Sequence, residues 1–219
     1  MRKAFYILIG LILVTAQKAY AFDNHDFQIW NTDVEEFKIN ASSRMALEEE
    51  FRLGGNAGDF YYQHYDLGFI HDLNKYLNIG AGYRQIYEKK NSSFKQENEP
   101  YVSATVFYDL NGFKLDSRSR LEYRHFDYQS DSWRYRNKFN VKFPWKFTSM
   151  QIQPYVADEI FIKLNGIVLN TNRLYAGLGF NLTKNLKGEV YYLLQDTENT
   201  DTHKWTDINV LGTKLKISF

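Results

Sequence analysis

The chain contains no cysteine, only three prolines, and no long apolar segment after its N-terminal leader. The lack of cysteine excludes disulfides and thiolate metal sites. Because no later window approaches 18 apolar residues, any integration into a membrane must use strands. The negative mean hydropathy, −0.51, argues against a helical membrane protein but suits a barrel, whose strands are only half apolar. Without the leader the chain has 24 basic and 26 acidic residues, a balance that gives no support for nucleic-acid binding.

The first 21 residues have the three parts of a secretory signal peptide. Arg2 and Lys3 form a basic start, and residues 4–14 are an apolar run of 11 residues, too short to span a bilayer as a helix. Ala19-Tyr20-Ala21 has the small-x-small pattern that signal peptidase accepts. We therefore expect export and cleavage after Ala21, which leaves residues 22–219 as a single barrel domain. The alternative is an uncleaved anchor or a buried helix.

Aromatic residues are abundant, with 17 tyrosines, 17 phenylalanines and 4 tryptophans, and they alternate with charges in the stretch Phe113–Phe143. Alternate positions there carry Lys114, Asp116, Arg118, Arg120, Glu122 and Arg124, and then Arg134, Arg136, Lys138, Asn140 and Lys142. The intervening positions are largely apolar or aromatic. A period of two over this length predicts two strands. In a soluble sandwich the apolar face would form the core, whereas in a membrane barrel it faces lipid and the charges line the lumen.

Similar alternation recurs in eleven extended segments along the chain. The connections near Asn40, Asp72, Asn111, Pro144 and Lys184 are predicted to be short turns, and Asn111-Gly112 is a type I′ hairpin signal. The connections near Gly54, Lys89, Tyr128, Leu164 and Asp196 are mostly longer and more polar, and residues 89–98 in particular have the composition of a loop. Short turns at one rim and long loops at the other are typical of outer-membrane barrels.

The end of the chain favours the membrane barrel. Leu215, Ile217 and Phe219 alternate with polar residues, an ending that resembles the terminal signal by which outer-membrane proteins reach their insertion machinery. We therefore predict an all-β fold, an antiparallel transmembrane up-and-down β-barrel in the bacterial outer membrane. Single-chain bacterial barrels have even strand numbers, so we expect ten to twelve strands and favour twelve. Residues 26–37 are the difficulty, because as a wall strand they would have to descend from outside, which a periplasmic N-terminus forbids.

The lumen of such a barrel is the candidate site. Its predicted basic residues are Arg44, Arg52, Arg84, Lys114, Arg118, Arg120, Arg124, Arg134, Arg136, Lys138 and Arg173, with Lys142 and Lys187 on the same face. Its predicted acidic residues are Glu48, Glu50, Asp66, Asp116, Glu122, Glu159 and Glu189. Positive charge is therefore concentrated inside. Aromatic residues near strand ends are expected to form interfacial girdles, or alternatively to fill a core: Trp30, Tyr61, Tyr87, Tyr108, Trp133, Trp145 and Trp205.

Three functions remain open at this stage. The lumen could be filled by arginine–carboxylate ladders, which would make a closed structural or binding barrel. A ring of arginines could instead form a narrow anion-preferring channel for small solutes. A lipid- or peptide-modifying enzyme is the third, with His64 and Asp66 on one face as a base and its orienter. We expect no enzyme, no cofactor and no metal, since alternation sends Glu49 to the face opposite Glu48 and Glu50.

Several short motifs also occur in a fixed order along the chain. They are Trp30 in an early strand, Glu48-Glu49-Glu50-Phe51-Arg52, Gly82-Tyr83-Arg84, Arg118-Ser119-Arg120-Leu121-Glu122-Tyr123-Arg124, Arg134-Tyr135-Arg136, Pro154-Tyr155 with Glu159-Ile160-Phe161, and Asn172-Arg173-Leu174-Tyr175-Ala176-Gly177-Leu178. In this order they resemble the outer-membrane family catalogued as domain of unknown function 2490. The resemblance implies an outer-membrane barrel and carries no established activity or substrate. We expect a monomer whose partners are outer-membrane lipid, the insertion machinery and, for a channel, a small anionic solute.

Overall fold

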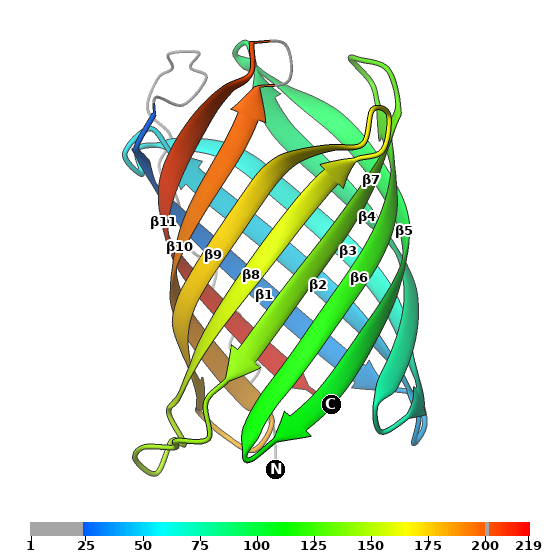
Figure 1. The fold of residues 1–219 in the computed structure, drawn as a ribbon, viewed down its shortest axis with the longest axis vertical. Coiled ribbons are helices and arrows are strands. Elements are labelled where there is room, and N and C mark those ends of the chain that lie inside the picture. The colour runs from blue at the N-terminus through cyan, green and yellow to red at the C-terminus, as the bar shows by residue number, and fades with distance from the viewer. Residues whose placement is uncertain (1–23, 200–201) are drawn as a thin grey trace, which may run out of the picture.

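The computed structural model of the protein describes residues 24–199 and 202–219, so the predicted signal peptide lies outside the described part. Within that part the fold is all-β, a closed barrel of eleven strands (Figure 1). In chain order these are β1 (Asp26–Lys38), β2 (Ser43–Gly54), β3 (Asp59–Asn74), β4 (Leu77–Lys90), β5 (Ser93–Leu110), β6 (Phe113–Phe126), β7 (Ser132–Lys142), β8 (Gln153–Lys163), β9 (Val168–Asn181), β10 (Leu186–Asn199) and β11 (Lys204–Ser218). No helix among the described residues is long and apolar enough to cross a membrane.

The barrel closes through a pairing that the sequence did not predict. Consecutive strands pair antiparallel, and β1 and β11 then pair parallel, from Asp26 beside Ile208 to Glu36 beside Ser218. A parallel closing pair lets an odd number of strands complete the ring. Residues 26–37 therefore belong to the wall. The described residues contain eleven strands instead of the favoured twelve, so the argument from even strand numbers does not hold.

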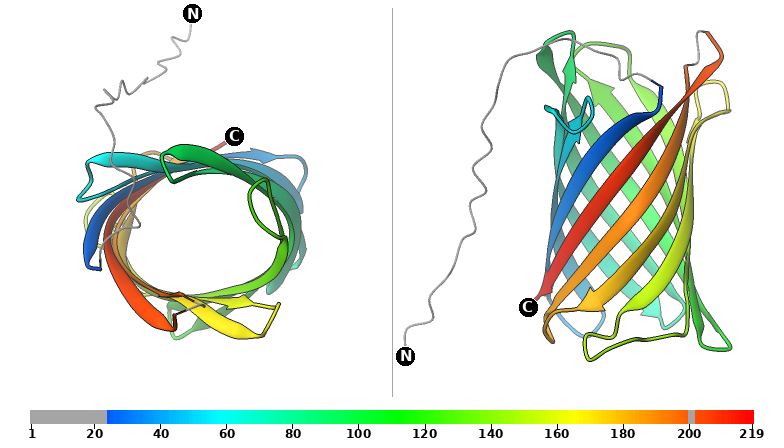
Figure 2. Two further views of the ribbon diagram at one scale, coloured as in Figure 1. Left: turned by 90° about the horizontal axis from the view of Figure 1, so that it is seen from above. Right: turned by 90° about the vertical axis from the view of Figure 1, so that its left-hand side faces the viewer.

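The two rims differ less than the sequence suggests. We call the rim where β11 ends the C-terminal rim, and the rim where β1 begins the N-terminal rim (Figure 1, Figure 2). Among the described residues the longest connection, residues 143–152 between β7 and β8, lies on the C-terminal rim, where short turns were expected. The predicted polar loop at residues 89–98 is instead the paired ends of β4 and β5. Only Asn91 and Ser92 connect these strands, and their φ angles of 49° and 73° suit a tight hairpin turn.

Side chains alternate between the inside and the outside of the wall, as the period of two requires. Along β1 every second residue is buried, from Asp26 to Val34, and the residues between them are partly or fully exposed. The outer face carries exposed apolar side chains such as Val102, Leu174 and Tyr192. An apolar cluster inside the barrel contains Trp30, Tyr155, Ala157, Tyr175, Tyr191, Leu193 and Val210. The buried core therefore lies in the lumen, which the strands enclose as an oval ring (Figure 2).

One part of the outer face is polar. Asp33 and Glu35 on β1 alternate with the buried residues of that strand, and Glu49 on β2 lies opposite Asp33 in the antiparallel register. On its other side Asp33 pairs with Leu215 of β11. These three carboxylates therefore form an acidic patch on a largely apolar exterior. Glu49 lies on the face opposite Glu48 and Glu50, where alternation puts it.

Candidate functional site

Arginines and glutamates from five consecutive strands meet inside the barrel. We call this series the arginine–glutamate chain: Glu97 and Glu99 on β5, Glu122 and Arg124 on β6, Arg134 and Arg136 on β7, Glu159 on β8, and Arg173 on β9. Residues two apart on a strand share a face, and the register places opposite charges beside each other. Glu122, for example, lies opposite Arg134, and Glu159 lies opposite Arg173.

The contacts along this chain are short, and arginines alternate with glutamates. Arg124 donates from Nε and Nη2 to the two carboxylate oxygens of Glu97, at 2.5 and 2.9 Å, and its Nε lies 3.3 Å from Glu99. Arg134 donates to Glu99 at 2.5 Å and also to Glu122. Planar guanidinium groups suit such forked contacts with carboxylates. The alternating contacts therefore tie β5, β6 and β7 together through their side chains.

The central carboxylates of the chain are removed from solvent. Glu99, Glu122 and Glu159 are all 0% exposed. Glu159 accepts Nε–H of Arg136 at 2.6 Å and the hydroxyl of Tyr175 at 2.8 Å. An uncompensated buried charge is costly, and breaking a buried pair from one side typically costs about 3–5 kcal/mol. The arginines are therefore needed to keep these carboxylates inside the barrel.

A second set of charges, the His64 cluster, lies on neighbouring strands: Glu48, Glu50 and Arg52 on β2, His64 and Asp66 on β3, and Arg84 on β4. Arg84 donates to Asp66 at 2.9 Å and lies 3.3 Å from Glu48. Arg120 of β6 connects the two sets, since its Nη1 is 3.6 Å from Asp66 and 3.8 Å from Glu122. The charges inside the barrel therefore form one network that joins strands far apart in the ring.

Aromatic rings fill the space beside these charges. The guanidinium of Arg52 lies 3.7 Å from the ring centroid of Trp30, and that of Arg173 lies 4.9 Å from it. Stacking of this kind suits arginine. The prediction that Trp30 and Tyr61 belong to an exterior girdle is wrong. Both are buried inside the barrel, where they donate hydrogen bonds to the amide oxygen of Gln28 at 2.9 and 2.7 Å.

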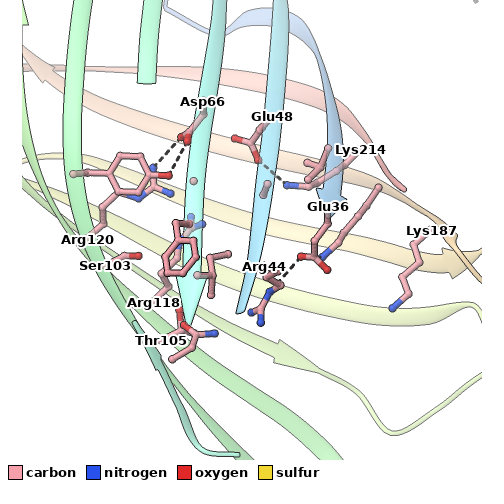
Figure 3. Close-up of a pocket in the computed structure, with 18 of the residues that line it drawn as sticks. Glu36, Arg44, Glu48, Asp66, Ser103, Thr105, Arg118, Arg120, Lys187 and Lys214 are labelled. Atoms are coloured by element: carbon pink, nitrogen blue, oxygen red, sulfur yellow. Dashed lines mark hydrogen bonds and ion pairs between the residues drawn. The ribbon is translucent and has the colours of Figure 1, made fainter. Parts of the chain in front are cut away.

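The half of the barrel near the C-terminal rim contains a cavity of about 600 Å³, which we call the basic chamber (Figure 3). Its lining includes Glu36, Arg44 and Glu48 on one side and Ser103, Thr105, Arg118 and Arg120 on another. A smaller cavity of about 250 Å³ shares Arg118 and Lys142 with it and extends to Trp30. The Arg118 side chain remains 36% exposed, so solvent reaches this part of the lumen.

The predicted lumen residues divide among these three regions. The arginine–glutamate chain contains Glu122, Arg124, Arg134, Arg136, Glu159 and Arg173. The His64 cluster contains Glu48, Glu50, Arg52, Asp66 and Arg84. The basic chamber and its adjoining cavities are lined by Arg44, Lys114, Asp116, Arg118, Arg120, Lys138, Lys142, Lys187 and Glu189.

Sequence reasoning missed Glu97 and Glu99, because the polar run around them has the composition of a loop. The signal that could have found them is alternation, since they continue the inward face of Tyr101 at a spacing of two. It also missed the aromatic partners of the arginines. The ring centroid of Phe161 lies 4.7 Å from the guanidinium carbons of both Arg136 and Arg173.

His64 and Asp66 share a face of β3, but their side chains have different hydrogen-bond partners. His64 is 1% exposed and contacts Glu48 through Nε2 at 3.3 Å and the Tyr62 hydroxyl through Nδ1 at 3.1 Å. The carboxylate of Asp66 instead accepts hydrogen bonds from Arg84 and Tyr101. In the described part of the chain, no group of three or more His, Asp or Glu side chains is placed to hold a metal ion.

The comparisons with known proteins give one match. A family model described as "Protein of unknown function (DUF2490)" matches residues 27–206, which is more than half of the chain. No curated protein and no solved structure matches the chain significantly. The match agrees with the resemblance carried by the ordered motifs. The chain belongs to this family of proteins of unknown function, DUF2490.

Proposed function

We propose that the protein is an outer-membrane β-barrel of a Gram-negative bacterium with a closed lumen, which acts as a structural or binding barrel and not as a porin. The observation that carries this proposal is the burial of Glu99, Glu122 and Glu159 in the arginine–glutamate chain. A passage for hydrated solutes along this chain would expose these carboxylates to water. Their arginine partners oppose such an opening, because separating a buried pair leaves an uncompensated charge.

The outer face and the strand lengths support membrane insertion. The strands are 11 to 18 residues long, enough for the roughly 9–11 residues that a tilted strand needs to cross a bilayer. Large apolar side chains cover most of the exterior. The predicted insertion signal, Leu215, Ile217 and Phe219, is consistent with this assignment, and the ring of Phe219 stacks on Phe37 at 5.0 Å. Export by a signal peptide cleaved after Ala21, insertion by the outer-membrane machinery and a monomeric state complete the proposal.

Tryptophan fluorescence can test this placement of the faces. Trp133 is 46% exposed on the outer face, whereas Trp30 is 2% exposed inside the barrel. Two variants that each keep one of these residues, with the other three tryptophans replaced by Phe, would be refolded into vesicles that contain brominated lipids. We expect the lipids to quench Trp133 strongly and to spare Trp30. Absence of quenching at Trp133, or equal quenching of both, would contradict the proposed membrane barrel.

The second candidate is a narrow anion-preferring channel for small solutes. It is favoured by the excess of basic side chains in the basic chamber and its adjoining cavities, where Lys142 and Lys187 have no ion pair within the described residues. This function requires a continuous opening through the arginine–glutamate chain, which conductance measurements detect directly. We propose no enzymatic role, because His64 is buried between Glu48 and Tyr62.

A further inference from the structure

The carboxylates on one wall of the basic chamber are already neutralised. This wall is formed by β1, β2 and β11 (Figure 3). Glu36 accepts a hydrogen bond from Lys216 at 2.7 Å, and Glu48 accepts one from Lys214 at 3.1 Å. Arg44 lies 3.4 Å from Glu36 as well. These acidic groups are therefore occupied by cations beside them and are not free to pair with cations elsewhere in the chamber.

The opposite wall, on β6 and β7, carries Arg118, Arg120 and Lys142, and the smaller adjoining cavity carries Lys138. None of these four cations makes a hydrogen bond to a carboxylate within the described residues. The nearest carboxylate oxygen to Arg118 belongs to Glu159 and is 3.9 Å away. Lys142 has no ion pair within the described residues, nor has Lys138, whose ammonium lies 3.7 Å from the ring centroid of Tyr175. The carboxylates nearest to Arg118 and Arg120 lie 3.6–3.9 Å away, so the protein balances the positive charge on this wall only in part.

Arg120 is the most informative of these cations. It is only 6% exposed, and neither Nε nor Nη1 makes a hydrogen bond. One face of its guanidinium packs against Tyr101, 3.8 Å from the ring centroid, and the side chain lines the basic chamber. Buried N–H groups normally have an acceptor, and leaving them without one is costly. Nη1 lies 3.6 Å from Asp66 and 3.8 Å from Glu122, too far for a hydrogen bond to either. Since both nitrogens are closed to solvent, an oxyanion in the chamber would stabilise this guanidinium through its charge.

The strand register adds hydroxyl groups to the same wall. Thr105 lies opposite Arg118, and Ser103 lies opposite Arg120. On the other side of β6, Arg118 lies opposite Lys138. Neither hydroxyl takes part in a hydrogen bond within the described residues. The wall thus combines fixed cations with neutral donors, the combination that recognises an oxyanion.

We propose that this wall binds the phosphate group of a small soluble ligand that enters from the C-terminal rim. A phosphate carries close to two negative charges at neutral pH and offers several acceptor oxygens, so it suits two guanidinium groups, two ammonium groups and two hydroxyls better than a single carboxylate does. The cavity of about 600 Å³ is in the range of small-ligand sites. The inference rests on the proposed closed lumen, since a ligand that cannot pass the arginine–glutamate chain enters and leaves by one rim.

Isothermal titration calorimetry tests this site on the protein refolded in a phosphate-free detergent, with inorganic phosphate and glycerol 3-phosphate as probes. We expect saturable binding of one phosphate per barrel, weakened at least tenfold by Arg118→Gln. Arg118 is accessible and loosely paired, so its replacement should leave the fold intact, which circular dichroism checks. The matched control is Lys187→Gln, which removes another unpaired cation of the same chamber from β10, away from β6 and β7. We expect it to change affinity less than twofold.

Two results would overturn the assignment. The first is no saturable binding by the wild-type barrel. The second is equal weakening by Arg118→Gln and Lys187→Gln, which would indicate only a diffuse positive potential. Short-chain phosphatidic acid serves as a third probe, and tighter binding of it than of glycerol 3-phosphate would assign the wall to a lipid headgroup and overturn the soluble ligand. The titration in detergent micelles tests only the site, whereas conductance across a bilayer tests the closed lumen. Failure of the one can therefore be distinguished from failure of the other.

Discussion

Arg136 donates its Nε–H to Glu159 at 2.6 Å inside the barrel, and no part of Glu159 is exposed to solvent. We expect Glu159→Ala to lower the free energy of unfolding by about 3–5 kcal/mol, because it leaves buried Arg173 without a counter-charge and Arg136 with only Glu122, 3.6 Å away. Urea unfolding of the barrel refolded in lipid vesicles measures this. The matched control is Asp158→Ala on the same strand, whose carboxylate accepts a hydrogen bond from Asn172 on the outer face. A loss at Glu159 no larger than that at Asp158 would refute the role given to the arginine–glutamate chain.

Close packing against a glycine gives a second prediction. A methyl group added to Gly212 would overlap the ring of Tyr191, whereas one added to Gly179 would have no neighbour nearer than 3.9 Å. Both glycines lie in strands, so the change in backbone entropy is similar for the two. We expect Gly212→Ala to destabilise the barrel by about 1–3 kcal/mol through overpacking, and Gly179→Ala to have little effect. The same unfolding assay compares them, and equal effects would mean that Tyr191 moves aside freely.

The outward carboxylates near the closing pair test the exterior. If this face contacts lipid, Glu49→Leu should raise the free energy of unfolding in lipid vesicles, by about 1 kcal/mol, because a charge is removed from an apolar environment. The converse change two residues away on the same face, Leu47→Glu, should lower it. Destabilisation by Glu49→Leu would show that the patch formed by Asp33, Glu35 and Glu49 makes a stabilising contact that lipid alone does not provide.

The loop between β6 and β7, at the N-terminal rim, gives a pH-dependent prediction. Hydrogen bonds from Tyr123 at 2.6 Å and His125 at 3.0 Å lower the pKa of Asp131 to about 2 from its ordinary value of 3.8. A carboxyl with a lowered pKa stabilises the folded loop fully at pH above 3.8, and this contribution is lost as the pH falls through about 2. An NMR titration of the Asp131 carboxyl carbon should find a midpoint near 2, and Tyr123→Phe should raise it. A wild-type midpoint at the ordinary value would refute these contacts.

The faces of β6 and β7 could be predicted from the sequence, because alternation depends only on spacing along one strand. Arg118, Arg120 and Arg124 share the inner face for this reason. The parallel pairing of β1 with β11 could not be predicted, since strand direction at the closing pair is a property of the whole ring. Residues 26–37 therefore appeared to be excluded from the wall that they complete.

The partners of the inward charges were also beyond sequence reasoning. Whether a cation pairs with a carboxylate depends on the distance across the lumen between strands that are not neighbours in the barrel. Arg120 on β6 approaches Asp66 on β3, and Lys214 on β11 reaches Glu48 on β2. Such distances follow from the curvature of the closed barrel. The division into a filled network and an open basic chamber could be recognised only in the structure.

Conductance across a planar lipid bilayer tests the closed lumen most directly. The refolded protein would be added to the bilayer in concentrated potassium chloride, beside an open porin that confirms the sensitivity of the assay. We predict no steady conductance above background for the wild-type barrel, and conductance steps for a variant that shortens two arginines of the network, Arg134→Ala with Arg136→Ala. Reproducible steps from the wild-type protein, with chloride preferred over potassium, would contradict the closed lumen and favour the narrow anion channel.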